Sequence, residues 1–324
     1  MKKIKKISIA LSILSILTFF TPANAELKVV TSIKPIHSLV SYVMDGVGKP
    51  DIIVDGYNSP HNFSLKPSHA KMIENANLII WVGEDLETFL EKPLKTISKD
   101  AVNIEIMDLK EVKKLKFREK NIFEGHDDHG HDEHKEHGHD EHKEHGHKEK
   151  KHDDHGHGEH DPHVWLDPMN AKVIVKEIEN QLAKLDPDNA SKYKANSKKA
   201  QSELDNITKN IKKDLKKDLR FVVFHDAYQY FENRFNIKVL GALTVNPDVL
   251  PGAEQLSEIR EVIEHEKVNC LFSEPQFNPA IIKSIAKDTK IKTGVLDPLG
   301  ATIDKGKGMY TELLSNMYSS FKGC

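Results

Sequence analysis

Cysteine is scarce in this sequence of 324 residues, which contains only Cys270 and Cys324. In an oxidising compartment an even pair of cysteines indicates a disulfide rather than a thiol site. Closing a loop of about 55 residues would stabilise the fold by about 4 kcal/mol in the chain-entropy model and would fix the C-terminus to a strand. The alternative is a pair of free thiols, with Cys324 on a frayed tail.

Long apolar runs are also missing, except for one at the N-terminus. Lysines from Lys2 to Lys6 precede an apolar stretch from Ile7 to Phe20, and Ala23-Asn24-Ala25 offers a small-x-small cleavage site. This order is typical of a secretory signal peptide, and the stretch is shorter than the roughly 20 residues that span a bilayer. We therefore expect residues 1–25 to be removed, although an uncleaved anchor is the alternative.

The mature protein would begin at Glu26, and no cysteine follows the cleavage site to carry a lipid anchor. We expect it to be a soluble monomer without a membrane anchor, in the periplasm of a Gram-negative bacterium. Removal of the leader changes the formal charge from −3 to −7, because the leader holds four lysines and no acidic residue. The absence of a basic excess disfavours a nucleic-acid partner.

Short runs rich in valine and isoleucine recur along the chain, and each is followed by a helix-like pattern. They predict parallel strands joined by crossover helices. Four runs lie on either side of a region without strand patterns, which predicts two α/β lobes, each with a four-stranded, mainly parallel sheet flanked by helices. The runs begin at Leu27, Asp51, Asn77 and Val102 in the first half and at Phe221, Ile237, Val268 and Ile291 in the second.

Two helices are predicted between the lobes. The first covers Asn170 to Leu185, and the residues from Asp186 to Asn189 break it and supply a new N-cap. The second runs to about Leu219, and some 30 residues would reach about 45 Å. We interpret it as a long rigid helix joining the lobes, with a coiled-coil dimer helix as the alternative. The predicted domains are residues 26–185, the linking helix 186–219 and residues 220–324.

The first lobe contains an insertion, at residues 125–160, with almost no apolar side chains. Between His126 and His160 it holds 13 of the 19 histidines, and an eight-residue repeat, HDEHKEHG, occurs twice in succession. Such a segment cannot bury enough apolar surface to offset the entropy of ordering, so we expect it to be disordered. Its neutral imidazoles should bind divalent metals weakly and at several places. A solvated spacer with incidental metal affinity is the alternative.

The histidines outside the insertion differ in setting. His69 and His265 lie in polar helical patterns and are expected on exposed helix surfaces, and His37 opens the first helix. The remaining three lie in loops or at strand ends beside prolines or turns. Because open α/β sheets bind ligands at the carboxyl ends of their strands, two lobes would bring these three to one cleft. They are His61, His163 and His225.

Three imidazoles with a fourth oxygen ligand suit tetrahedral zinc, whereas manganese prefers more oxygen ligands. Asp297, at the end of the last predicted strand, is a candidate fourth ligand or an ordinary turn aspartate. Three histidines on zinc also describe hydrolytic sites, but those often take two ligands from one H-E-x-x-H motif, which is absent here. No clear general base accompanies the three histidines, so we do not expect an enzyme.

Five stretches, in this order, carry a family resemblance over nearly all of the mature chain: SPHNFSLKPSHAKMIENANLIIWVGEDLE, DPHVWLDPMNA, FHDAYQYFENRF, FSEPQFNP and LDPLGA. They resemble the metal-binding solute-binding proteins of ABC importers, of the lipoprotein and adhesin type, and are most similar to its zinc-uptake branch. The resemblance implies two α/β lobes joined by a rigid helix, with one metal held between them by His61, His163 and His225.

The resemblance also implies the metal and the partner. Manganese-importing relatives place a carboxylate where His225 stands, so this histidine favours Zn²⁺ as the transported ligand. The histidine-rich insertion and the cysteine pair likewise resemble the zinc branch. Some zinc members have a glutamate directly before the first ligand, where this chain has Pro60. The fourth position is therefore open to water, Asp297 or an insertion histidine.

The implied function is capture of Zn²⁺ for delivery to the membrane permease of an ABC importer. The alternatives are a receptor for manganese or another divalent metal, a periplasmic zinc buffer, or an adhesin.

Overall fold

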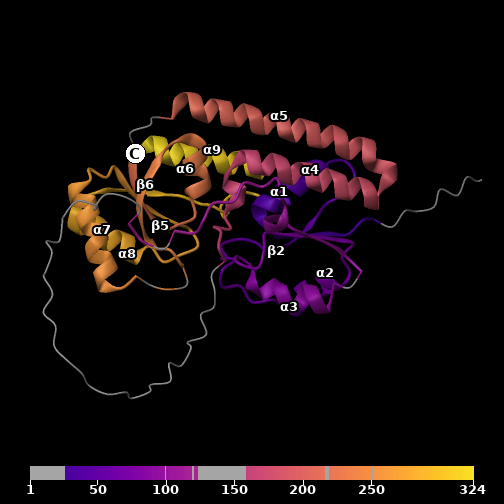
Figure 1. Cartoon of the computed structure of the whole chain (residues 1–324), viewed down its shortest axis with the longest axis horizontal. Helices are drawn as coiled ribbons and strands as arrows, with labels where there is room; N and C mark the ends of the chain where they lie inside the picture. Colours follow the sequence, from indigo (N-terminus) through magenta and orange to yellow (C-terminus); the bar gives the residue numbers. More distant parts are fainter. Residues whose placement is uncertain are drawn as a thin grey trace, which may run out of the picture.

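The computed structural model describes residues 26–98, 100–118, 120–122, 158–215, 219–247, 249 and 251–324. The predicted leader and most of the histidine-rich insertion lie outside these residues. The described chain forms two α/β lobes side by side, with a layer of long helices across one face of both (Figure 1). The two-lobed α/β prediction is therefore correct.

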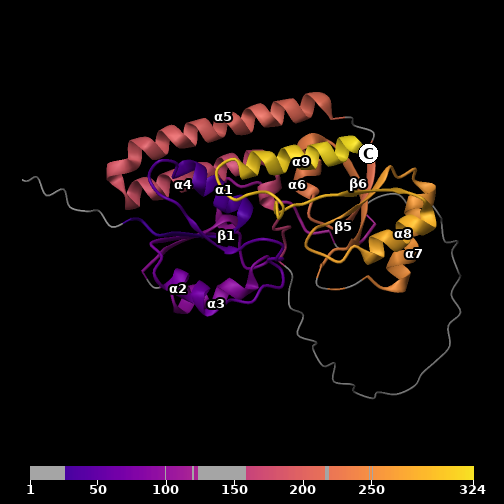
Figure 2. The ribbon, with the colours of Figure 1, turned by 180° about the vertical axis from the view of Figure 1, so that it is seen from behind.

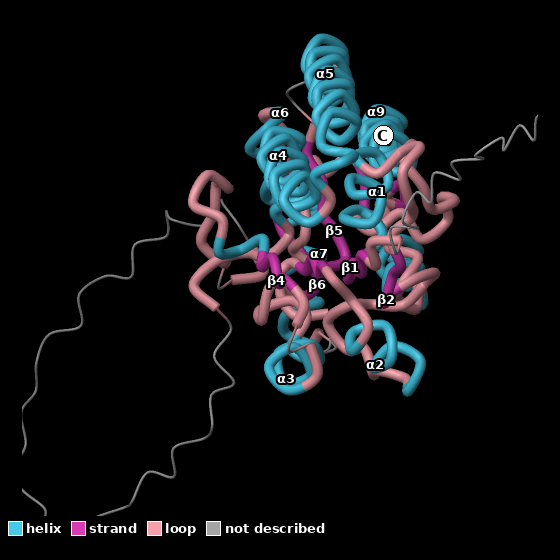
Figure 3. The backbone as a smooth tube through the Cα atoms, turned by 90° about the vertical axis from the view of Figure 1, so that its right-hand side faces the viewer, coloured by secondary structure: helices cyan, strands magenta, loops and turns pink. Residues whose placement is uncertain are grey.

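The first lobe is built on a parallel sheet with the strand order β2-β1-β3-β4. All five residues of β1, and all four of β3, are buried, because helices cover both faces of the sheet (Figure 3). The elements are β1 (Val29–Ile33), α1 (Lys34–Val43), β2 (Asp51–Val54), α2 (Pro67–Glu74), β3 (Leu78–Trp81), α3 (Thr88–Thr96) and β4 (Val102–Glu105).

The second lobe repeats the arrangement, with the parallel order β6-β5-β7-β8. All eight predicted strands are present, and each overlaps its valine- and isoleucine-rich run. The elements are β5 (Arg220–His225), α6 (Gln229–Phe235), β6 (Lys238–Thr244), α7 (Ala253–His265), β7 (Cys270–Ser273), α8 (Ala280–Thr289), β8 (Lys292–Val295) and α9 (Met309–Gly323).

Helices α4 (Pro168–Leu185) and α5 (Ala190–Asp214) lie against each other, with α4 over the first lobe and α5 extending from there toward the second (Figures 1 and 2). Asp167 caps α4 by accepting a hydrogen bond from the Met169 amide, and Pro168 occupies the first turn, where no amide is needed. The break after Leu185 was predicted correctly. It contains a short 3-10 turn, Pro187–Asn189.

Helix α5 is shorter than predicted. It ends at Asp214 rather than near Leu219, because Leu215 adopts an extended conformation (ψ 124°) and buries its side chain. The apolar stripe of α5, including Leu204 and Ile211, is buried within this chain against α1, α4 and α9. The stripe is thus used for packing within the chain, which favours the linking helix over the coiled-coil dimer helix. Because α9 returns from the second lobe to contact α1 and α5, the lobes are joined by more than one helix.

The predicted disulfide is present. Cys270, the first residue of β7, is bonded to Cys324 at the end of α9, with a Cα–Cα distance of 5.8 Å. The C-terminus is thus fixed to a strand of the second sheet, as expected. Among the described residues, no helix is long and apolar enough to cross a membrane.

Two histidines differ from or refine their predictions. His69 is buried rather than exposed, and its Nδ1 accepts a hydrogen bond from the Lys66 amide at the start of α2 (3.2 Å). His37 is buried in α1 with its Nε2 3.2 Å from the carbonyl oxygen of Pro50. Burial lowers the pKa of His37, which therefore stays neutral near pH 7. His265, at the end of α7, is exposed as predicted.

Candidate metal centre

The three predicted histidines lie together between the lobes. His61 follows β2, His163 immediately precedes a 3-10 turn (Val164–Leu166), and His225 is the last residue of β5. One ligand atom from each residue can be chosen so that all three lie within 4.8 Å of one another. The ring centroids are 5.2 to 5.6 Å apart. His163 and His225 are buried, and His61 is half-buried.

The spacing of the buried pair fits a tetrahedral ion. The Nε2 atoms of His163 and His225 are 3.3 Å apart. Two nitrogen ligands at the Zn–N distance of about 2.0–2.1 Å in a tetrahedral site are about 3.3–3.4 Å apart. Three imidazoles supply the borderline-soft nitrogen donors that zinc prefers, and a fourth position stays available for an exchangeable ligand.

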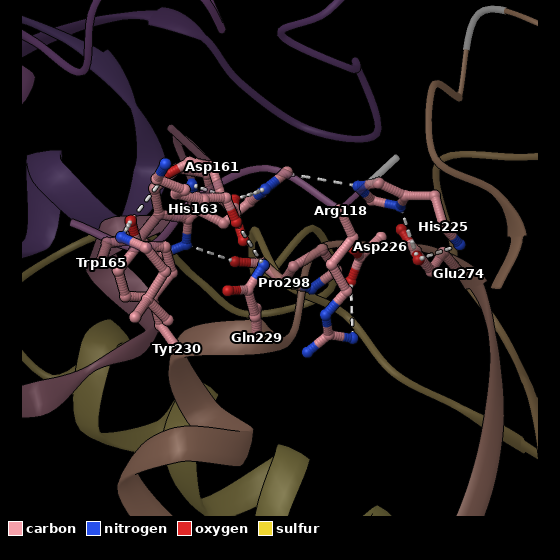
Figure 4. Close-up of polar contacts among 12 residues, drawn as sticks. Arg118, Asp161, His163, Trp165, His225, Asp226, Gln229, Tyr230, Glu274 and Pro298 are labelled. Atoms are coloured by element: carbon pink, nitrogen blue, oxygen red, sulfur yellow. Dashed lines mark hydrogen bonds and ion pairs between the residues drawn. The ribbon is translucent and has the colours of Figure 1, made fainter. Parts of the chain in front are cut away.

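Carboxylates hold the two buried rings by the nitrogen that faces away from this centre. The Nδ1 of His163 lies 2.7 Å from Asp161 Oδ1, and the Nδ1 of His225 lies 2.7 Å from Glu274 Oε1 (Figure 4). A carboxylate at Nδ1 fixes the proton there, so the Nε2 lone pair is free for a metal. Asp161 also accepts a hydrogen bond from the His163 amide.

Sequence reasoning missed both carboxylates. Asp161 stands two residues before His163, a spacing that allows the backbone and ring contacts seen here. Glu274 directly follows β7, which pairs with β5, the strand that ends in His225. The adjacency of these strand ends was the signal that could have identified Glu274.

The surroundings determine which imidazole is neutral. Burial lowers the pKa of His163 well below its usual value, and the charge of His225 lowers it further. For His225 burial also acts to lower the pKa, but the charge and hydrogen bond of Glu274, together with the charges of Asp226 and Asp161, outweigh it and the net pKa is raised.

The cavity wall is mostly apolar. The histidines enclose about 10 Å³ together with Trp165, Phe277 and Leu299, which is close to the space that one water-sized particle needs. The ring centroid of His163 is 5.2 Å from that of Trp165, and that of His225 is 5.7 Å from that of Phe277. A cavity of this size suits a single bare ion rather than an organic substrate.

Asp297 behaves as a turn residue. Its Oδ1 accepts hydrogen bonds from Gln276 Nε2 (2.9 Å) and from the Leu299 amide (3.3 Å). Of the two alternatives left open by the sequence, these contacts favour the turn. Within the described ranges, the group of converging ligand atoms contains the three histidines and no carboxylate.

A buried ionic cluster lies beside the centre. Arg118 contacts Asp226 Oδ1 (3.3 Å; Figure 4) and Glu232 Oε2 (3.0 Å). Burial raises the pKa of both acids to about 7 against the opposing charge of Arg118. Arg118 belongs to the segment that leads into the insertion. The Phe117 amide donates a hydrogen bond to the carbonyl oxygen of Glu159. The chain segment before the insertion therefore contacts the end of the insertion, close to Asp161, which supports His163.

We expect Glu274→Gln to weaken zinc binding by roughly 10- to 100-fold, because the amide oxygen can still accept a hydrogen bond from Nδ1 but carries no negative charge to raise the basicity of the ring. The affinity is measured by competition with a chromophoric chelator. Glu264→Gln, an exposed change on α7, is the matched control and should leave the affinity unchanged. Equal affinities for the two variants would contradict the role of Glu274.

Two parallel α/β lobes with imidazoles converging between them define a two-lobed metal-binding protein. The same fold occurs in a crystal structure of ZnuA (TM-score 0.72, 20% identity, covering 92% of this chain and 99% of that one). It also occurs in the laminin-binding adhesin Lmb of Streptococcus agalactiae (TM-score 0.71, 23% identity, covering 91% and 98%). At these identities the likeness concerns the fold.

The sequence comparisons identify the family. Residues 29–324 match the family described as the periplasmic zinc-uptake complex component A, and the chain belongs to this family. The high-affinity zinc uptake system protein ZnuA of Brucella abortus (strain 2308) is 48% identical over 304 residues, covering 91% of each chain. The resemblance inferred from the five motifs is therefore confirmed, and so is Zn²⁺ as the bound ligand.

Proposed function

We propose that the mature chain captures one Zn²⁺ between its lobes with the imidazoles of His61, His163 and His225. The observation that carries this proposal is the convergence of three ligand atoms, from three separate segments of the chain, within 4.8 Å. The carboxylates at the Nδ1 atoms of His163 and His225 support it, because they direct both Nε2 atoms to the same point. Water is the proposed fourth ligand.

The proposed partner is the membrane permease of an ABC importer, to which the protein delivers the ion as a monomer. Residues 1–25 would direct the chain to the periplasm and be removed there. The family, a periplasmic component of zinc-uptake complexes, supports this route. Because α5 and α9 link the two lobes, release would depend on movement of a loop or one lobe edge rather than on a wide hinge motion.

The proposal favours zinc over manganese, since all three candidate ligands are nitrogen atoms and manganese prefers more oxygen. A competition titration of the mature protein with Zn²⁺ and Mn²⁺, with metal counted per chain, tests it. We expect one tight Zn²⁺ that excess Mn²⁺ does not displace. Stoichiometric Mn²⁺ binding of equal strength would favour the alternative receptor.

The histidine-rich insertion would act as a tethered reservoir that raises the local zinc concentration near the centre. A deletion of residues 125–157 keeps Gly158 and Glu159, which the structure describes and of which Glu159 accepts a hydrogen bond from the Phe117 amide. We expect this deletion to leave one tight zinc site and to remove the additional weak ones, as counted by isothermal titration. Loss of the tight site as well would make the insertion the primary receptor.

We do not propose an enzyme. The carboxylates closest to the rings, Asp161 and Glu274, each contact an imidazole Nδ1 at 2.7 Å, so neither is placed as a free general base. In an esterase assay and a CO₂-hydration assay, the zinc-loaded protein should catalyse neither reaction faster than the same concentration of free Zn²⁺.

A further inference from the structure

Lys34 makes a buried connection between the first lobe and a loop of the second. It is the first residue of α1, directly after β1, and is 5% exposed. Its Nζ donates hydrogen bonds to the carbonyl oxygens of Gly300 (2.6 Å), Ala301 (3.2 Å) and Ile303 (2.5 Å). These residues belong to the loop between β8 and α9, and three carbonyl groups of one turn thus converge on a single ammonium group.

A buried ammonium group is a costly way to fill space. Removing a charge from water is unfavourable unless its hydrogen bonds are all replaced, and an apolar side chain of similar length would avoid that cost. Lys34 has three donors, and the loop supplies three acceptors. Burial lowers the pKa of Lys34, and nearby Asp55, Asp297 and Asp304 oppose this shift.

The loop that Lys34 holds forms one wall of the metal cavity. Pro298 and Leu299 line the cavity with the three histidines, and the Pro298 carbonyl accepts a hydrogen bond from Trp165 Nε1 (2.8 Å) (Figure 4). Gly300 has φ +66°, and an added Cβ would lie 2.1 Å from Met309 Cε. The backbone conformation of this turn is therefore tightly restricted between Lys34, which holds it on one side, and Leu299, which lines the cavity.

We propose that Lys34 is a positioning residue: it keeps the loop 297–303 closed over the metal cavity and so sets the rate at which zinc leaves. Lys34 acts through the loop, with Leu299 as the part of the loop that meets the cavity. This inference rests on the proposed zinc site at His61, His163 and His225, and it concerns the kinetics of that site rather than its ligands.

Two other lysines join the same segment to the first lobe but differ in exposure. Lys305 contacts Asp55 (3.0 Å) and Lys307 contacts Asp45 (2.7 Å), and about half of each of these side chains is exposed. Exposed ion pairs contribute little, and both lie beyond the residues that line the cavity. Lys307→Met is therefore a matched control for Lys34→Met, since both replace an inter-lobe lysine by the same apolar side chain.

The test is the rate of zinc release from the mature protein after mixing with excess chelator. Loss of three charge-assisted hydrogen bonds in Lys34→Met should raise the dissociation rate by roughly tenfold or more, with little change in the association rate. One zinc per chain should still bind, because the three imidazoles remain. For Lys307→Met we expect rates within about twofold of the wild type.

A folded Lys34→Met protein with the wild-type dissociation rate would overturn the proposal. A second result would also overturn it: Lys34→Met lowers the melting temperature equally with and without zinc and leaves the rate of zinc release unchanged. That result would indicate a merely structural role for Lys34. If Lys34→Met does not fold, Lys34→Gln keeps two donors and should give an intermediate release rate. Hydrogen exchange of the Leu299 and Ile303 amides in the wild type needs no variant: we expect zinc to slow it, and exchange unaffected by zinc would also overturn the proposal.

The outcome is separable from failure of the zinc site itself. If the histidines are not the ligands, replacing His225 will leave the stoichiometry unchanged whatever Lys34 does. If the ligands are correct and only the loop proposal is wrong, His225→Ala will lose tight zinc while Lys34→Met behaves like Lys307→Met.

Discussion

Replacing His225 by alanine should abolish tight zinc binding. The side chain supplies one of three nitrogen atoms, and its Nε2 lies 3.3 Å from that of His163, the separation expected for two ligands of one zinc ion. Loss of an outer partner costs roughly 10- to 100-fold in metal affinity. Loss of a ligand should cost more, on the order of a thousandfold, and should leave Glu274 buried without its imidazole partner.

The variant is best measured in the chain that lacks residues 125–157, so that the insertion histidines do not mask the loss. Chelator competition gives the affinity, and metal analysis gives the stoichiometry. His265→Ala, on the exposed end of α7, is the matched control and should bind one zinc ion as tightly as the parent. Unchanged affinity after the His225 substitution would defeat the ligand assignment.

Breaking the Cys270–Cys324 disulfide should lower the free energy of unfolding by about 4 kcal/mol. The sequence separation is 54 residues, and in the chain-entropy model opening a loop of that size restores this much freedom to the unfolded chain. Cys270 is fully buried at the start of β7, so the double variant should carry alanine rather than serine there, which avoids an unpaired hydroxyl. Urea unfolding of the zinc-free protein measures the effect.

Reduction of the wild type is the matched comparison, because it opens the same loop and keeps both sulfur atoms as thiols. Both forms should lose similar stability and still bind one zinc ion when folded, since the disulfide lies at the opposite end of β7 from Glu274. A reduced protein as stable as the oxidised one would show that the C-terminus is held by the packing of α9 alone.

The strands were predictable because their apolar runs are short, rich in valine and isoleucine, and buried on both faces, as β1 and β3 show. Helix ends were less predictable. The lysine-rich pattern of α5 continues past Asp214, but the buried side chain of Leu215 turns the backbone out of the helix. The domain boundaries proposed at 185/186 and 219/220 stay a prediction.

The three candidate ligands were found from their places at loops and strand ends, and the structure brings them together. Their supporting groups were not found, because Glu274 meets His225 only through the pairing of β5 with β7, across 49 residues of sequence. His69 was misassigned for a similar reason: a polar helical pattern does not reveal that an imidazole accepts a bond from the Lys66 amide. Lys34 also gave no sequence signal, since its partners are backbone carbonyl groups.

A crystal structure of the zinc-loaded mature protein, with anomalous diffraction recorded at the zinc edge, measures the coordination directly. One strong anomalous peak should lie about 2.0–2.1 Å from a nitrogen atom of each of His61, His163 and His225. A peak bound elsewhere, or one that touches only one of these imidazoles, would contradict the account.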